Sequence, residues 1–161
     1  MKSLRNSIPA ALAAAFVPVF GLLVVVRGHD TDWDFRNYHW YNAYAWLTGR
    51  HGFDVAVAHH ATYYNPLVDV PVFLMAQAIP LWCVGFLVGC IHGLNLLLLY
   101  YLARAALAAA GGSSSDWLAL AIAIAGTTGG MALFLVGNAS NDMTLSLLVL
   151  LALLLLVRAG D

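Results

Sequence analysis

The residues of this chain that could do chemistry are concentrated in one stretch, from Gly28 to Asp69. That stretch holds five of the eight acidic residues and five of the six histidines: Asp30, Asp32, Asp34, Asp54, Asp69, His29, His39, His51, His59 and His60. The chain contains no His-Glu-x-x-His zinc motif, no glycine-rich phosphate loop and no serine nucleophile elbow. Any reaction at this stretch is therefore expected to use carboxylates as acid or base.

The alternating acids Asp30, Asp32 and Asp34 have a spacing that occurs in calcium-binding loops. An EF-hand would need a glycine after the third acid and a glutamate at the twelfth position, but a phenylalanine and a tyrosine stand there. The EF-hand is excluded. Two interpretations stay open, a looser divalent-cation site that uses His29, Asp30 and Asp32, or a solvated acidic turn.

The composition around this stretch is that of an integral membrane protein. Of 161 residues, 62% are hydrophobic and only 9% are charged, and the mean hydropathy is +0.82, whereas soluble domains have about a quarter of their residues charged. The net charge is −1 and the basic residues are scattered, so no nucleic-acid partner is expected. We predict an all-α, polytopic helical fold in one membrane domain.

The elements that position the polar stretch follow from the lengths of the uncharged runs. A bilayer core of about 30 Å needs about 20 helical residues. The run of 33 residues without a charge from Val70 to Leu102 is too long for one span, and Pro80 divides it. We predict about four transmembrane helices, a long first loop and a juxtamembrane helix, with these bounds: transmembrane helices 8–26, 84–102, 117–136 and 143–157, outer loop 27–69, and juxtamembrane helix 70–80. The glycines of Gly126-Thr-Thr-Gly-Gly130 should loosen or break the third span near its middle.

The basic residues Lys2, Arg5, Arg104 and Arg158 all fall on one side of this arrangement. By the positive-inside rule that side is cytoplasmic, so we expect a cytoplasmic amino terminus. The first loop then faces outward, together with the short polar turn 138–142. Within the loop, residues 38–49 are expected to form a short interfacial helix or an ordinary aromatic anchor.

The second predicted span carries Gly85, Gly89 and Gly93 at steps of four, which leaves a smooth strip for close approach of another helix. This strip is a candidate surface for a helix–helix partner. His92 and Asn95 lie near it and are expected to form hydrogen bonds between helices rather than to bind a ligand.

The sequence from Asp34 to Gly49, DFRNYHWYNAYAWLTG, followed by Tyr64-Asn-Pro-Leu67, resembles the first outward loop of the GT-C superfamily of polytopic glycosyltransferases. The resemblance implies a sugar donor carried on a polyprenyl phosphate, the membrane lipid as surroundings, and a site at the outer face of a membrane, which we expect to be the bacterial inner membrane. It implies Asp34 as catalytic base and Asp142 as a second acidic residue, although Asp142 could instead cap the fourth span with Asn141. The residues expected to bind the substrate are Arg36, Tyr38, His39, Tyr41, Arg50, Tyr64 and Asn65.

Members of that superfamily usually have more spans, so we expect this chain to be the amino-terminal part of a larger protein. A competing hypothesis is a non-enzymatic membrane subunit, such as a transporter or assembly component. An ion pathway would need an ionisable residue at mid-membrane depth, and His92 is the candidate for that role. Most polar residues lie at one face instead, which favours interfacial chemistry on a lipid-linked substrate.

Overall fold

The computed structural model describes residues 2–28, 32–110, 115–138 and 141–159. Within these ranges the secondary structure is helical, without strands. The α-helices are α1 (Lys2–Arg27), α2 (Trp40–Thr48), α3 (Asp69–Ala78), α4 (Leu81–Ala109), α5 (Asp116–Thr127), α6 (Gly130–Phe134) and α7 (Asn141–Ala159). A π-helix (Phe35–His39) and three 3₁₀ turns (Arg50–Gly52, His59–Tyr63 and Pro66–Val68) complete the polar stretch.

Three of these helices, α1, α4 and α7, are long and apolar enough to cross a membrane in the part of the chain that the structure describes. They contain the predicted spans 8–26, 84–102 and 143–157 and extend past them. α4 begins directly after Pro80, because the residue before a proline is pushed out of the helical region and Ile79 is extended. It continues to Ala109 because alanine favours helix whether or not the membrane core has ended.

The predicted third span, 117–136, is two helices rather than one. α5 has 12 residues and ends at Thr127, and at about 1.5 Å per residue it falls well short of a core of about 30 Å. The hydroxyls of Thr127 and Thr128 donate to Ala123 O and Ile124 O inside α5, and the extended Gly129 begins the five-residue α6. The break was predicted; a continuous helix over the whole span was not found.

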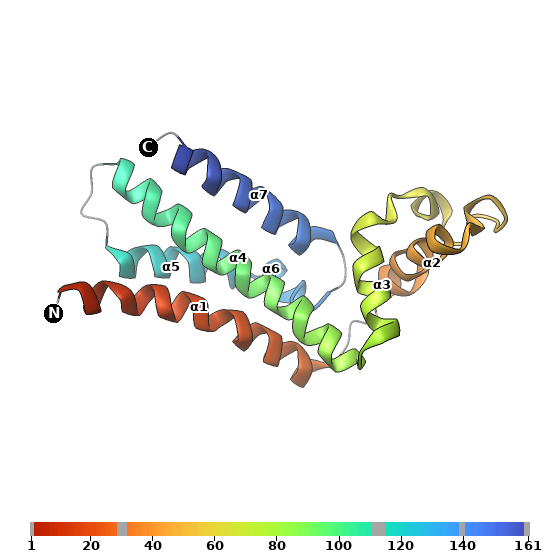
Figure 1. Cartoon of the computed structure of the whole chain (residues 1–161), viewed down its shortest axis with the longest axis horizontal. Helices are drawn as coiled ribbons and strands as arrows, with labels where there is room; N and C mark the ends of the chain where they lie inside the picture. Colours follow the sequence, from red (N-terminus) through yellow and green to blue (C-terminus); the bar gives the residue numbers. More distant parts are fainter. Residues whose placement is uncertain (1, 29–31, 111–114, 139–140, 160–161) are drawn as a thin grey trace.

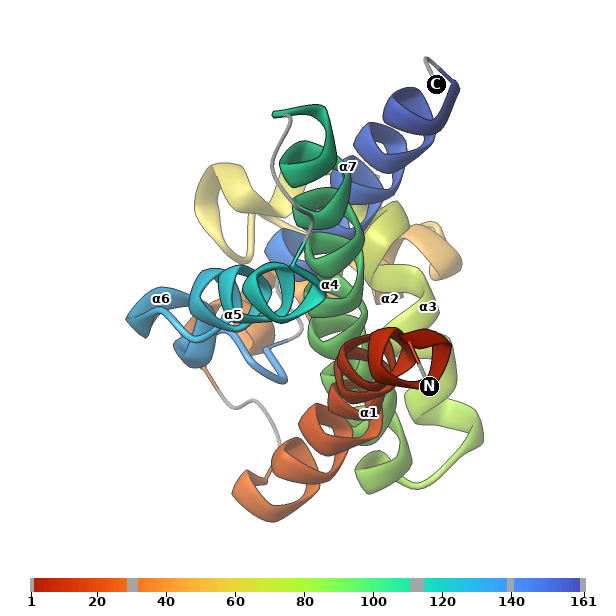
Figure 2. The same cartoon turned by 90° about the vertical axis from the view of Figure 1, so that its left-hand side faces the viewer.

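The long helices run side by side, with α4 and α7 in one direction and α1 in the opposite direction (Figure 1). α4 lies at the centre and contacts α1, α5 and α7, with α1 and α7 on opposite sides of it (Figure 2). The start of α1 and the ends of α4 and α7 lie toward one end, here called the terminal end, and α2 and α3 project from the other, here called the polar end (Figure 1). Three of the four predicted spans are thus present as long apolar helices; the fourth span and which end faces the cytoplasm stay predictions.

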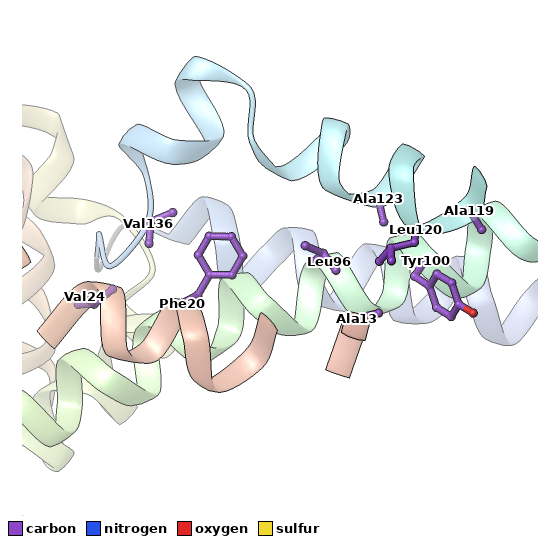
Figure 3. Close-up of a cluster of buried hydrophobic side chains, with 9 residues drawn as sticks. All are labelled: Ala13, Phe20, Val24, Leu96, Tyr100, Ala119, Leu120, Ala123 and Val136. Atoms are coloured by element: carbon purple, nitrogen blue, oxygen red, sulfur yellow. The ribbon is translucent and has the colours of Figure 1, made fainter. Parts of the chain in front are cut away.

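The hydrophobic core lies between α1, α4 and α5 (Figure 3). Its buried residues are Ala13, Phe20, Val24, Leu96, Tyr100, Ala119, Leu120, Ala123 and Val136. The predicted glycine strip on α4 faces this core: a Cβ at Gly89 would lie 2.6 Å from the carbonyl oxygen of Phe20, and one at Gly93 would lie 2.7 Å from that of Phe16. At these two positions the helix that approaches closely is α1 of the same chain.

His92 and Asn95 form hydrogen bonds between helices, as predicted. The buried His92 donates from Nε2 to the carbonyl oxygen of Thr127 at 3.1 Å, and its Nδ1 lies 3.1 Å from the sulfur of Met143. Asn95 donates to the backbone oxygen of Met143 at 2.9 Å. Together they connect α4 to the broken end of α5 and to the first turn of α7.

In the polar stretch, the predicted helices 38–49 and 70–80 correspond to α2 and α3. α2 ends at Gly49, whose φ of 69° is the left-handed conformation that favours glycine at a helix end. α3 runs across the axis of the bundle (Figure 1), the orientation expected of a helix that lies along a membrane surface.

Candidate active site at the polar end of the bundle

Asp32 connects the first loop to the segment that precedes α7. Its Oδ1 accepts a hydrogen bond of 2.7 Å from the backbone N–H of Phe35, which caps the following helical turns. Its Oδ2 accepts a bond of 2.8 Å from the side-chain amide of Asn138. The two polar segments that were expected to share one face are therefore in direct contact.

Asp34 is exposed and stands directly before the π-helix. Tyr38, four residues later, lies against this carboxylate. Burial raises the pKa of the Tyr38 phenol to about 12, and the negative charge of Asp34 and a hydrogen bond to it add to the shift. The protonated phenol can donate to the carboxylate and hold it in one orientation. Asp34 is thus a carboxylate that is open to solvent and has a fixed neighbour.

The π-helix sets the direction of the side chains that follow Asp34. The N–H of Trp40 bonds to the carbonyl oxygen of Phe35, five residues back, so the turn is wider than an α-helical turn. On it, the ring of Tyr38 contacts that of His39 at a centroid distance of 4.3 Å. It also meets the Tyr64 ring edge-to-face at 5.7 Å. Such local departures from α-helix are frequent at functional sites.

His39, which contacts the Tyr38 ring, forms a buried pair with Asp69. Nδ1 of His39 lies 2.9 Å from Oδ1 of Asp69, and each side chain is only 7% exposed. The pair connects the π-helix to the first residue of α3, across 30 positions of the sequence. His39 was predicted to bind substrate, which stays a prediction; its Nδ1 faces Asp69 inside the fold. The spacing of the two residues in the sequence did not predict this pair.

Two other predicted binding residues, Tyr41 and Arg50, meet at Asp54. Arg50 donates to both carboxylate oxygens, at 2.9 and 2.7 Å, and the Tyr41 hydroxyl donates at 2.7 Å. The hydrogen bonds from Arg50 and Tyr41 lower the pKa of the Asp54 carboxyl to about 2. Burial and the bond to Asp54 raise the pKa of the Tyr41 phenol. This cluster stabilises the turn after α2 and leaves Arg50 occupied.

Two more arginines, Arg27 and Arg36, lie at the end of α1 and on the π-helix. Arg27, at the end of α1, donates from Nη1 to the carbonyl oxygen of Leu133 at 3.1 Å. Arg36 donates from Nε to the backbone oxygen of Asp32 at 3.3 Å. Both side chains are exposed, and each of these bonds uses one of the five guanidinium N–H groups. The remaining donors could hold an anion such as a phosphate.

Asp142 is the second acidic residue that was expected at the site. Asp142 is exposed in the first turn of α7, where a negative charge stabilises the helix. His29 and Asp30 lie outside the described residues, so the structure does not place this half of the predicted divalent-cation site. Among the residues that it describes, no three His, Cys, Asp or Glu side chains come together as metal ligands would.

Comparison with family models, curated proteins and solved structures gives no match. What this chain does is therefore argued from its own residues and their geometry.

The remaining predicted binding residues, Tyr64 and Asn65, line an open groove with a volume of about 570 Å³. Asn65 also caps the following 3₁₀ turn, since its Oδ1 accepts from the N–H of Leu67 at 3.0 Å. Trp46, on α2, also lines this groove. Sequence patterns placed Tyr64 and Asn65 in the site, but not the helix with which they form a groove.

Proposed function

We propose that this chain is a glycosyltransferase-like membrane protein that transfers a sugar from a polyprenyl-phosphate donor to an acceptor at the polar end of the bundle. The observation that carries the proposal is the exposed Asp34 carboxylate, which lies near Tyr38 and two residues after the Asp32 that bonds to Asn138, just before α7. A carboxylate at that height meets an acceptor from the water while a lipid-linked donor stays among the helices. The resemblance of residues 34–49 and 64–67 to the first outward loop of the GT-C superfamily agrees with this role.

The reaction asks little of the protein besides one base. The acceptor hydroxyl attacks the anomeric carbon and gives its proton to the Asp34 carboxylate. The bond between that carbon and the phosphate oxygen breaks, and polyprenyl phosphate leaves with the electron pair. Because this leaving group is stable as an anion, no strong general acid is needed.

Arg36 and Arg27 are the proposed contacts of the donor phosphate. Arginine forks match phosphate oxygens in geometry and charge, and both guanidinium groups lie at the polar end close to Asp32 or to α6. Arg50 is assigned no such contact, because its fork is occupied by Asp54. A divalent cation and a catalytic role for Asp142 remain expectations from the sequence.

The competing hypothesis of a non-enzymatic subunit finds less support. Its discriminating feature is an ionisable residue available within the membrane. His92 is buried, but Nε2 is committed to Thr127 and Nδ1 faces Met143. Its contacts are those of an interhelical connector.

The test is Asp34→Asn in the full protein, reconstituted with radiolabelled hexose on undecaprenyl phosphate. Asparagine keeps the size of the side chain but cannot take a proton. Transfer of label out of the lipid fraction should fall by about 10² to 10⁴, the contribution of a positioned acid–base group. Helical content and thermal stability should stay at the parent values.

The control is Asp116→Asn at the terminal end, where the carboxylate pairs with Arg104 at 2.7 Å; this variant should retain transfer. Loss of transfer in Asp142→Asn with normal transfer in Asp34→Asn would reverse the two assigned roles. Normal transfer in both acidic variants at the polar end would refute the enzyme hypothesis for this site.

A further inference from the structure

The groove beside the carboxylate site is lined by exposed aromatic rings. Trp46 is 55% exposed, Tyr63 68% and Tyr64 50%, and all three line the groove of about 570 Å³. Large rings are usually buried against other apolar groups. Three half-exposed rings around one concave surface are typical of a binding site, where ring faces are kept for a ligand.

The polar side chains of the groove carry amide, imidazole and phenol groups. Asn65 uses its Oδ1 for Leu67, which leaves its amide nitrogen as a donor. Nε2 of His51 is buried and has no hydrogen-bond partner in the described part of the chain, and the His51 ring meets Trp46 edge-to-face at 6.4 Å. No Asp, Glu, Lys or Arg is among the residues that line this groove.

This combination defines the class of ligand. Flat aromatic faces stack on the C–H faces of a pyranose ring. The pyranose C–H groups carry a slight positive charge, and the aromatic face carries a slight negative one. Amide, imidazole and phenol groups match the hydroxyls at the edge of such a ring. Without a charged side chain in the lining, the groove offers nothing to compensate the charge of an anionic or cationic ligand.

The groove adjoins the carboxylate site at Tyr64. One side of the Tyr64 residue lines the groove, and its ring meets that of Tyr38 edge-to-face, which in turn lies against Asp34. Only the Tyr64 ring therefore separates a ligand in the groove from Tyr38, which lies next to the proposed base Asp34.

We propose that this groove binds a neutral saccharide, which serves as the acceptor whose hydroxyl is presented to Asp34. The acceptor role rests on the proposed function; the binding itself does not. Trp46 is a binding residue in this proposal, and Tyr64 is the wall shared by the two parts of the site.

The experiment measures binding of maltotriose, mannotriose and galactotriose to the purified full chain in detergent micelles, by ligand-observed saturation-transfer NMR. Trigalacturonic acid is the charged probe. At least one neutral trisaccharide should bind saturably, and Trp46→Ala should weaken that binding by about tenfold, as expected for the loss of one stacked ring. Tyr63→Ala is a second variant in the same groove and should also weaken it.

Trp33→Ala is the matched control. Trp33 is 59% exposed but does not line the groove, so this variant should bind as the parent does. Absence of saturable binding by every trisaccharide would overturn the proposal. So would equal losses in the Trp46 and Trp33 variants, or tighter binding of trigalacturonic acid than of the neutral sugars.

The Asp34→Asn variant separates this proposal from the proposed function. Saccharide binding should be unchanged in it while transfer is lost. If binding is present and depends on Trp46 but Asp34→Asn transfers normally, the groove stands and the assigned base fails. If transfer depends on Asp34 and no saccharide binds, the groove fails and the base stands.

Discussion

The backbone of α1 lies so close to Gly93 of α4 that one methyl group added at this glycine should destabilise the protein. A Cβ at this position would lie 2.7 Å from the carbonyl oxygen of Phe16 and 2.8 Å from the amide nitrogen of Val17. Ordinary contacts of this kind need about 3.5 Å or more. The atoms that it would meet belong to the backbone of α1, so no side-chain rotation can relieve the overlap and α1 must move.

Overpacking of this kind costs about 1 to 3 kcal/mol, and replacing glycine by alanine inside a helix returns about 1 kcal/mol. Gly93→Ala should therefore lower the free energy of unfolding by up to about 2 kcal/mol. The assay is reversible unfolding in mixed micelles of mild detergent and SDS, followed by far-UV circular dichroism. The polar stretch follows directly after α1, so a displacement of α1 should also lower the transfer activity.

Gly126→Ala on α5 is the matched control. A Cβ there would lie 3.5 Å from Cδ1 of Leu99, an ordinary contact, so this variant should be as stable as the parent or slightly more stable. Parental stability of Gly93→Ala would refute the close packing of α1 on α4. It would leave the glycine strip open for a helix of another protein.

Two further predictions concern the polar stretch. Asp69→Ala should reduce hydrogen-exchange protection in the π-helix and in α3 by about 1 to 3 kcal/mol, because it leaves the buried His39 without its partner. His39→Ala should have a similar effect, and the double variant should lose less than the sum of the two. The bonds that lower the pKa of Asp54 to about 2 stabilise the turn fully above the ordinary carboxyl pKa of about 4 and are lost as the pH falls through about 2. The amide of Phe53, which bonds to Arg50 O, should keep its protection from pH 7 to about 4 and lose it below, whereas Asp54→Asn should remove this acid dependence.

The sequence predicted the parts of the fold that depend on length and local pattern. The apolar runs identified α1, α4 and α7, and Pro80 marked the start of α4. The glycines and threonines at 126–130 predicted the break after α5. What failed there was only the assumption that a broken run would still serve as one helix of full length.

The sequence indicated candidate site residues, whose roles stay predictions, but it did not indicate their pairings. The contact of His39 with Asp69 depends on the path of the chain through 49–68, which consists of short turns that no periodicity predicts. Arg50 and Asp54, by contrast, stand at the i, i+4 spacing of helical ion pairs. That spacing could have indicated from the sequence that Arg50 is occupied.

The break between α5 and α6 also explains how the carboxylates come to stand at the end of α1. An unbroken helix would keep residues 130–138 on the straight axis of α5, because a helix advances about 1.5 Å per residue without changing direction. After the break, Val136 joins the core, and Gly137 approaches Val24 so closely that a Cβ would lie 2.6 Å from Cγ2. Asn138 then reaches Asp32. A feature that weakens the third span as a membrane helix is thus the one that joins the two polar segments of the site.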